Sequence, residues 1–341
     1  CTPLILDPAP SVPFISNRSL NLAVVLADES GGGRLARVKI PDVTPRAIRV
    51  SKRRHEFVLL EDVIRHNLAQ LFPGVSIVSA HQFRVIRDAD IEIRELEAGD
   101  LIESIEQTIR LRRFGDPVLL EVDEGMPEEV RRKLMHLLNL DESDTFRVKG
   151  ILGFDVFWQL ASIDKPSLRY RPHHPFLSES LSSYRTLFST IKEADVIVHH
   201  PFDSFRTVEE FVASAAVDPK VIGIKQTLYR VGRESPIVES LLKAAESGKQ
   251  VAVLVELKAR FDESNNLVWA RALERAGVHV TYGFPELKTH CKLCLVVRRE
   301  DEGIATYAHI GTGNYNPTTA RLYTDLGLFT ADPEITQDVA E

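Results

Sequence analysis

The sequence predicts an α/β protein with two domains: an α+β head over residues 1–176 and an α/β domain with a mostly parallel sheet over residues 177–341. Three observations support this prediction. A chain of 341 residues is long enough for about two domains. From about residue 177, helical and strand-like patterns alternate regularly, which is typical of crossover units in a parallel sheet. A polar, proline-containing stretch at residues 165–175 separates this region from a less regular one.

The elements of the first domain follow from apolar spacing and from the positions of proline and glycine. Pro127 is expected in the first turn of a helix, where proline is tolerated because its missing N–H has no helical partner there. The Pro73-Gly74 pair ends an earlier helix. In chain order we expect strands at 20–27, 35–40 and 47–50, a helix at 60–71, a strand at 76–87, a helix at 100–113, a strand at 117–122 and a helix at 127–138.

In the second domain, capping residues mark where the alternating elements begin and end. Ser235-Pro236 is expected to start one helix, and Gly277 to end another. Polar pairs such as His199-His200 and Tyr229-Arg230 follow strands, at the strand ends where ligands of parallel sheets bind. The expected helices are 181–194, 207–216, 237–246 and 266–276, and the expected strands are 195–199, 221–227, 251–257 and 278–282.

The chemistry of the chain is concentrated in residues 284–325. His290 and Lys292 alternate with neighbours in an apolar run that is typical of a strand, so both side chains should share one face. A strand at 305–310 leads into the turn Gly311–Asn316, whose glycines let backbone amides approach an anion. A histidine nucleophile, a lysine and an amide-rich turn together indicate phosphoryl transfer.

Each of these residues also has a plain structural interpretation. The buried position expected for Lys292 favours function, because a buried ammonium is costly unless an anion pairs with it. The alternatives are a packed strand histidine for His290, solvated or paired surface charges for Arg230 and Arg260, a simple hairpin loop for Gly311–Asn316, a core position for Tyr323, strand-end packing for His199 and His200, and a structural role for His279.

Composition narrows the classes of partner. The net charge is −7 and the pI is about 5.9, so no general attraction to nucleic acid or to an anionic membrane is expected. A polyanionic substrate would need a local basic pocket, for which the 29 Arg against 13 Lys are suited. Three cysteines fit a reducing cytosol, and no apolar run reaches the length of a membrane span. We expect a cytoplasmic protein, with peripheral attachment to the inner membrane as the alternative.

Seven segments of the chain, in order, resemble the sequences of bacterial polyphosphate kinases. They are FISNRSLNLAVVL, FVLLEDVIRHNL, VIVHHPFDSF, IKQTLYRV, VELKARFDE, LKTHCKL and AHIGTGNYNPTTARLYTD. The lobes of this family have the phospholipase D-like fold. The resemblance therefore implies that residues 1–176 are the head, or middle, domain and that residues 177–341 are the first of two phospholipase D-like lobes, incomplete at its C-terminus. The N-terminal domain and the second lobe would be missing, and we expect such a fragment to be inactive alone.

The resemblance also implies an activity, a set of substrates and a set of site residues. The activity is reversible transfer of the ATP γ-phosphate to inorganic polyphosphate through a phosphohistidine intermediate, with Mg²⁺, in a homo-oligomer. The matching positions are His290 for the phosphohistidine, Lys292 and Asn314 for phosphate binding, Tyr323 for ATP, and Arg230 and Arg260 for the magnesium neighbourhood. Because a guanidinium cannot ligate a cation, both arginines are interpreted as clamps on phosphates that carry Mg²⁺.

Two other functions stay open. A phospholipase D-like phosphodiesterase would use the same histidine, but the pattern of that class has Asp seven residues after it, where this chain has Val297. The acidic net charge also counts against a nucleic-acid or lipid substrate. A non-catalytic scaffold is the third possibility, and the presence of His290, Lys292, Arg230 and Arg260 argues against it.

Overall fold

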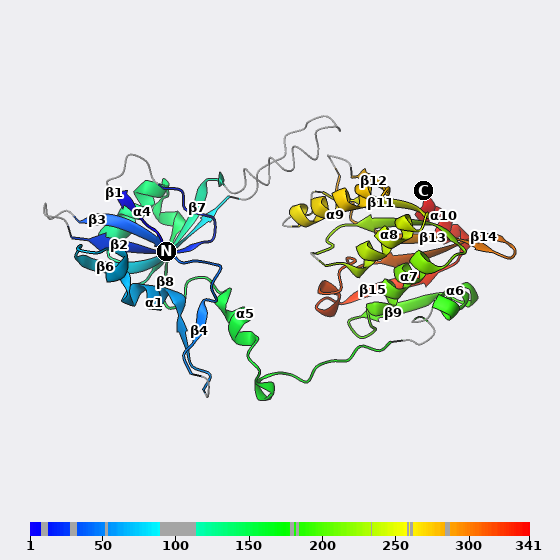
Figure 1. The fold of residues 1–341 in the computed structure, drawn as a ribbon, viewed down its shortest axis with the longest axis horizontal. Coiled ribbons are helices and arrows are strands. Elements are labelled where there is room, and N and C mark those ends of the chain that lie inside the picture. The colour runs from blue at the N-terminus through cyan, green and yellow to red at the C-terminus, as the bar shows by residue number, and fades with distance from the viewer. Residues whose placement is uncertain are drawn as a thin grey trace. The chain divides into compact units, whose positions relative to one another are not determined.

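The structure is a computed structural model that describes residues 1–7, 13–27, 33–51, 54–88, 114–177, 181, 184–232, 234–257, 259, 262–283 and 287–341 (Figure 1). These residues divide into two compact units. The first takes in the described residues up to 88 and from 114 to Tyr170, and the second takes in those from Arg171 to Glu341. The units thus divide between Tyr170 and Arg171, while the domain boundary expected at residue 176 stays a prediction.

The first unit is a six-stranded sheet with a helix layer on each face. The sheet order is β1-β3-β2-β6-β7-β8, antiparallel except for the β7–β8 pair. Along β2, Ala23 enters the core on the α4 side, and Leu22 and Val24 enter the core beside α1 and α2. The elements are β1 (Pro3–Asp7), β2 (Leu20–Leu26), β3 (Arg34–Lys39), β4 (Ala47–Arg49), β5 (Phe57–Leu59), α1 (Leu60–His66), α2 (Leu68–Leu71), β6 (Ile77–Arg87), β7 (Pro117–Asp123), α4 (Glu128–Leu138), η2 (Glu142–Asp144), β8 (Thr145–Val148), α5 (Val156–Ala161) and η3 (Pro166–Leu168).

The first unit departs from the predicted elements in two ways. The single helix expected at 60–71 is divided at Asn67, whose φ of −107° and ψ of 15° are not helical. The Asn67 side chain donates to the Val63 carbonyl at 2.8 Å, which is the local backbone bonding that makes asparagine a poor interior helix residue. Strands β1, β5 and β8 and helix α5 were not expected, because such short segments carry little periodicity. The helix expected at 100–113 lies outside the described residues.

The second unit is a seven-stranded mixed sheet in the order β12-β11-β10-β13-β14-β15-β9. The α/β class is confirmed, but the expectation of a mostly parallel sheet is wrong for strand pairing, since only two of the six neighbouring pairs are parallel. The reason is that β13, β14 and β15 follow one another as antiparallel neighbours and insert between β10 and β9. The elements are α6 (Tyr184–Glu193), β9 (Val196–His200), α7 (Arg206–Val217), β10 (Val221–Leu228), α8 (Pro236–Glu246), β11 (Gln250–Val255), α9 (Glu263–Arg275), β12 (His279–Tyr282), β13 (Lys292–Glu300), β14 (Gly303–Gly311), η4 (Thr319–Arg321), β15 (Asp325–Thr330) and α10 (Pro333–Ala340).

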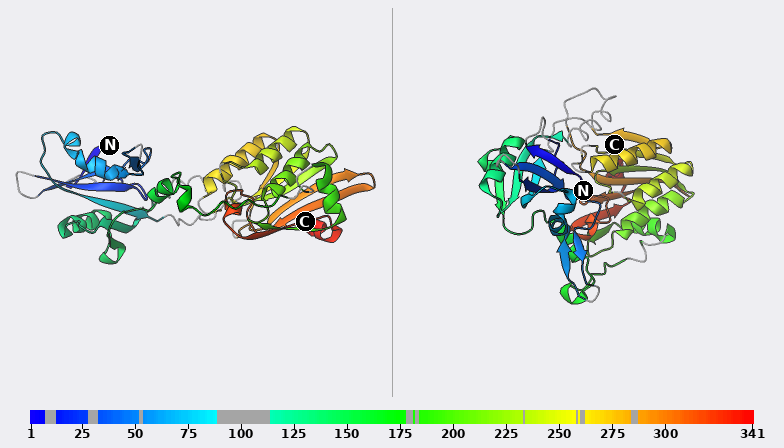
Figure 2. Two further views of the ribbon diagram at one scale, coloured as in Figure 1. Left: turned by 90° about the horizontal axis from the view of Figure 1, so that it is seen from below. Right: turned by 60° about the vertical axis from the view of Figure 1, so that its left-hand side comes forward.

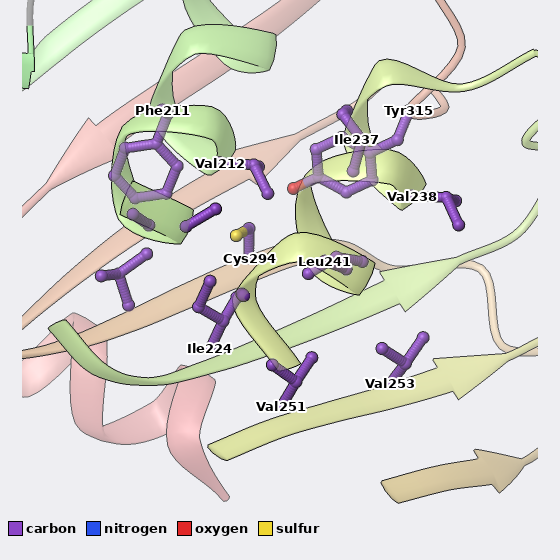
Figure 3. Packing of buried hydrophobic residues seen from close by; sticks show 14 of the residues in the cluster. Phe211, Val212, Ile224, Ile237, Val238, Leu241, Val251, Val253, Cys294 and Tyr315 are labelled. Atoms are coloured by element: carbon purple, nitrogen blue, oxygen red, sulfur yellow. The ribbon is translucent and has the colours of Figure 1, made fainter. Parts of the chain in front are cut away.

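Helices α7, α8 and α9 cover one face of this sheet, and α10 lies against β13 and β14 on the other (Figure 2). The main core fills the space beneath α7 and α8, where Phe211 and Leu241 meet Ile224 and Cys294 from the sheet (Figure 3). Each fully buried aliphatic side chain of this kind stabilises the fold by about 1.5–3 kcal/mol. None of the helices in the described part of the chain has the length and apolar character that crossing a bilayer requires.

The strand directions bring the ends of all seven strands to two opposite edges. Because β9, β10, β11, β12 and β14 run one way and β13 and β15 run the other, the first group ends at the same edge where β13 and β15 begin. That edge therefore carries the segments after Leu228 and Val255, the start of β13, the turn after Gly311 and the start of β15.

Candidate active site

His290 lies just before β13 and not within a strand, which corrects the prediction. The backbone pairing of β13 with β10 ends at Cys294 and Gln226. Beyond this pair, the Thr227 hydroxyl makes the hydrogen bonds to the segment that contains Cys291 and Leu293. The Thr227 Oγ1 donates to the Cys291 carbonyl at 2.9 Å and accepts from the Leu293 N–H at 2.9 Å. The side chain of His290 is consequently exposed at the sheet edge.

The expected closeness of His290 and Lys292 is nevertheless present, through Tyr229, which the sequence indicated only as half of a polar pair after a strand. The ring of Tyr229, directly after β10, meets the His290 imidazole edge to face, with centroids 5.1 Å apart and planes at 80°. The Lys292 Nζ lies 5.3 Å from the centre of the same ring, and the Arg230 guanidinium carbon lies 5.4 Å from it. Both distances are within the range of cation–π attraction. The only signal for Tyr229 in the sequence was its place after a buried strand.

Lys292 is a buried cation, as the alternation in the sequence predicted. It is 4% exposed and occupies the first position of β13, on the face that also presents the core residues Cys294 and Val296. Its Nζ donates to the His290 carbonyl oxygen at 2.5 Å. Burial lowers the pKa of Lys292, and the positive charge of Arg230 lowers it further, while nearby Cys291 and Asp325 oppose the shift. An anion at this edge would raise the pKa of Lys292 and favour its charged form.

The Gly311–Asn316 turn lies beside Lys292, because Gly311 pairs with Lys292 across β13 and β14. Gly313 is packed against β15 so closely that a Cβ there would lie 2.5 Å from the Asp325 carboxyl carbon. Asn316 fixes the far end of the turn: its Oδ1 accepts from the Thr318 N–H at 3.0 Å, and its Nδ2 donates to the Arg230 carbonyl at 3.3 Å. The turn is thus held between the lysine and arginine segments.

No contact in the described structure places the predicted site residues Asn314 and Tyr323 against His290. Tyr323 follows η4 and is 64% exposed, so its alternative interpretation as a core residue is wrong. Arg260 lies outside the described residues. Its neighbour Glu256 is buried, and the Glu256 Oε2 accepts from the Thr289 N–H at 2.6 Å, which holds the segment before His290. In the described part of the chain, no group of three or more His, Cys, Asp or Glu side chains is placed to hold a metal ion.

Two buried histidines lie behind the turn and were not predicted as a pair. His200 ends β9 and packs against Phe205 with ring centroids 5.4 Å apart, which confirms the strand-end interpretation. His309 on β14 is 2% exposed, and its Nδ1 lies 2.9 Å from the Tyr315 hydroxyl. Burial, and secondarily the neighbouring His200, lowers the pKa of His309 to about 3, so its imidazole is neutral at physiological pH.

Models of two domains of one protein family match the two parts of the chain. Residues 1–160 match the model of the polyphosphate kinase middle domain, and residues 186–341 match that of the polyphosphate kinase C-terminal domain 1. Polyphosphate kinase 1 from Chlorobaculum tepidum is 50% identical over 349 residues, a match that covers 100% of this chain and 50% of the relative. The polyphosphate kinase of Mycolicibacterium gilvum is 48% identical, with 100% of this chain and 48% of the relative covered.

A solved structure gives the same result for the fold. The crystal structure of polyphosphate kinase from Porphyromonas gingivalis superposes with a TM-score of 0.77 at 30% sequence identity, covering 99% of this chain and 50% of that chain. The chain spans about half the length of the curated relatives that it matches. Sequence and structure agree along its whole length: the chain belongs to the polyphosphate kinase family.

Proposed function

We propose that the full-length protein is an ATP:polyphosphate phosphotransferase that works through a phosphohistidine at His290. The observation that carries this proposal is the convergence of an exposed imidazole, a buried ammonium and a guanidinium on the ring of Tyr229. An exposed nucleophile beside desolvated cations is what phosphoryl transfer needs, because the protein's part in that reaction is mainly positioning and charge neutralisation.

The proposed reaction has two steps. An imidazole nitrogen of His290 attacks the γ-phosphorus of ATP, an N–P bond forms, the bond to the bridging oxygen breaks, and ADP leaves. The terminal oxygen of a polyphosphate chain then attacks the phosphohistidine, the N–P bond breaks, and the chain grows by one unit. The same two steps in reverse make ATP from ADP and polyphosphate.

Each of the remaining site residues has a part in binding phosphate. Lys292 and Arg230 neutralise the equatorial oxygens, Arg260 is proposed to act with Arg230 as a second clamp, and the Asn314 amide donates to a phosphate oxygen. Tyr323 offers an exposed ring that suits contact with ATP. Since the described residues include no cluster of metal ligands, Mg²⁺ would be carried on the nucleotide phosphates, where it offsets their negative charge.

A phospholipase D-like phosphodiesterase is the competing function, and the position of Val297 speaks against it. Val297 lies in the middle of β13, paired with Thr306 on β14 and with Gly223 on β10, and supplies no carboxylate. We further propose a cytoplasmic homo-oligomer without nucleic-acid partners, which is compatible with the acidic net charge.

Labelling with γ-labelled ATP tests the proposal in the full-length protein. We expect acid-labile, alkali-stable label on the protein, its loss together with polyphosphate synthesis in His290→Gln, and its retention in the control His279→Gln, an exposed histidine on β12. Label that persists in His290→Gln would remove His290 as the nucleophile. An unlabelled wild type that hydrolyses a phosphodiester would instead establish the competing function.

The 341-residue chain alone provides a second arm of the same test. We expect it to be inactive or nearly so, because an open site leaves the reacting groups in water with a high dielectric constant and without in-line positioning. Turnover of ATP with polyphosphate near that of the full-length protein would show that this chain holds the complete site.

A further inference from the structure

A small cavity lies behind the Gly311–Asn316 turn, between the end of β9 and strands β14 and β15. It offers about 10 Å³ to the centre of a water-sized molecule, and its lining includes His200, His309 and Asn314 as well as the glycines at 311, 313 and 327. A single buried water needs roughly 10–15 Å³ of such space. The cavity therefore matches one water molecule in size.

Three polar atoms of the cavity's lining residues are buried without a hydrogen-bond partner in the described structure. They are His200 Nε2, His309 Nε2 and Asn314 Oδ1. The two histidines are more than nine-tenths buried, at 4% and 2% exposure. Buried polar atoms in native proteins are nearly always paired with protein or with ordered water, so each of these three atoms needs a partner.

The proton positions on the two imidazoles determine what that partner must offer. His200 Nδ1 lies 2.8 Å from the Asp203 carbonyl oxygen, which only accepts, so Nδ1 carries the proton and Nε2 accepts. The Tyr315 hydroxyl lies 2.9 Å from His309 Nδ1 and 3.3 Å from the His309 carbonyl oxygen. When it donates along the shorter contact, Nδ1 accepts, so His309 Nε2 carries a proton and donates. Burial keeps His309 neutral, with its pKa near 3. The three atoms then comprise two acceptors and one donor.

We propose that this cavity binds one water molecule, which accepts from His309 Nε2–H and donates to His200 Nε2 and Asn314 Oδ1. A water molecule has two protons and two lone pairs, so it satisfies all three atoms at once. A metal ion would not bind the protonated Nε2 of His309, and a direct bond between the imidazoles would leave the amide oxygen unpaired.

The glycines around the cavity hold this space open. A Cβ at position 327 would come within 2.6 Å of His309 Nε2 and within 2.9 Å of Val198 Cγ2. A Cβ at position 311 would come within 3.2 Å of the His309 Cε1. These positions lie opposite each other in the β14–β15 pairing, so an alanine at Gly327 would place a methyl group beside the imidazole in a paired part of the sheet.

The water fixes the direction of the Asn314 amide, and this part of the inference rests on the proposed function. Asn314 is half-buried as a residue, while its Oδ1 is buried. With Oδ1 held inward by the water, the amide nitrogen is left to donate to a phosphate oxygen. The water is thus a positioning element behind the phosphate-binding turn.

High-resolution crystallography of the full-length protein tests the water directly. The expected result is one ordered water within 3.2 Å, an ordinary hydrogen-bond distance, of all three atoms. A metal ion at shorter ligand distances, an imidazole–imidazole contact or a dry cavity would each overturn the inference. None of these results depends on what the protein catalyses.

A double-mutant cycle tests the positioning role, with pyrophosphate binding to the full-length protein measured by calorimetry. We expect Asn314→Ala and Gly327→Ala each to weaken binding about tenfold, the size of one hydrogen bond to a charged group. The double variant should bind no more weakly than Asn314→Ala alone, and Gly223→Ala, on β10 and outside the cavity, should bind normally.

The outcomes distinguish the positioning role of the water from the phosphate-binding role of Asn314. Additive losses in the double variant, or normal binding by Gly327→Ala, would overturn the positioning role while leaving the phosphate site intact. Normal binding by Asn314→Ala would instead remove Asn314 from the proposed phosphate site, and the role of the water in orienting it would fall with it.

Discussion

Among the described residues, the two units of the molecule differ in how many buried polar atoms they leave without a partner. In the first unit, Arg46 makes a two-pronged contact with Glu61, whose side chain is fully buried, and Arg131 bridges Glu128 and Glu142. In the second unit, five buried side-chain atoms have no partner in the described structure, against two in the first. The five belong to His200, Gln226, Asn266, His309 and Asn314, and the two to Arg65 and His81.

This difference indicates that buried polar groups have different roles in the two units. Paired charges in the first unit hold its helices and the β4–β5 hairpin together. The unpaired atoms of the second unit come from β9, β10, β14, the turn after β14 and helix α9, around the sheet edge that carries His290. Natural proteins depart from full polar satisfaction mainly at functional sites. The comparison agrees with the proposed placement of the ligand-binding site in the second unit.

The largest expected effect concerns stability of the first unit. Arg46→Met leaves the Glu61 carboxylate buried without its partner, and breaking a buried pair in this way costs about 3–5 kcal/mol. The free energy of unfolding is measured from hydrogen exchange of the β2 amides. In the control Arg54→Met, whose partner Glu56 is half-exposed, we expect a loss below about 0.5 kcal/mol. Equal losses in both variants would show that the Arg46 pair is no more important than a surface pair.

The next largest effect is expected in the second unit, on the rate of phosphoryl transfer and not on stability. In the full-length protein, Lys292→Met should lower the proposed phosphoryl transfer by about 10²-fold, or roughly 3 kcal/mol, because it removes the cation proposed to face the transferred phosphate. The free energy of unfolding should not fall, since methionine removes a buried ammonium and keeps most of the apolar volume. Lys243→Met, on the exposed side of α8, is the matched control. If Lys292→Met lowered the free energy of unfolding and kept full activity, Lys292 would have a structural role like that of the paired charges in the first unit.

The smallest expected effect is a difference in acid sensitivity. The pKa of His309 falls from 6.5 to about 3 on folding, so the unfolded state binds the extra proton first as the pH drops. Stability of the second unit should be lost as the pH falls from 6.5 towards 3, by roughly 2 kcal/mol between pH 7 and pH 5. The first unit should lose less in this window, because His81, whose pKa burial also lowers, is only half-buried. The arginine partners of Glu128 lower its pKa to about 2, so its carboxylate stays charged and paired throughout this pH window.

In a variant that lacks Trp158, tryptophan fluorescence reports unfolding of the second unit alone. The chain has two tryptophans, and Trp269 in the second unit donates its indole N–H to the Gly232 carbonyl at 2.9 Å. Trp158→Phe removes the other one, which is 80% exposed. Urea unfolding of this variant at pH 7 and pH 5 gives the difference. A His309→Gln variant should show a smaller pH dependence, and an unchanged slope would assign the acid sensitivity to another group.

Much of the architecture was predictable because its signals are local. The caps and apolar spacing of α8 predicted its start at Pro236 to within one residue, and the Ser235 hydroxyl accepts from the Val238 N–H as a cap should. The order of strands in the sheet was not predictable, since β13–β15 insert between β10 and β9 through contacts that no local pattern records.

The candidate site divides in the same way. The closeness of His290 and Lys292 is visible in their spacing, whereas the contribution of Tyr229 depends on where β10 ends. The end of strand pairing at Thr227 is decided by a hydroxyl that bonds two backbone groups, which strand periodicity cannot show. His200 and His309 come from strands far apart in the chain, and only the folded sheet brings them to one cavity.

The pairing of β9 with β15 has a consequence for how the protein is made. His200 lies opposite Asp325, a partner 125 positions later in the chain. During synthesis at about 5–20 residues per second, β9 waits roughly 6–25 seconds for its only strand neighbour in the described sheet. Until then its backbone edge is open to pairing with other chains. The histidine behind the binding turn therefore reaches its place last, and a nascent chain that stalls before β15 is the form most exposed to aggregation.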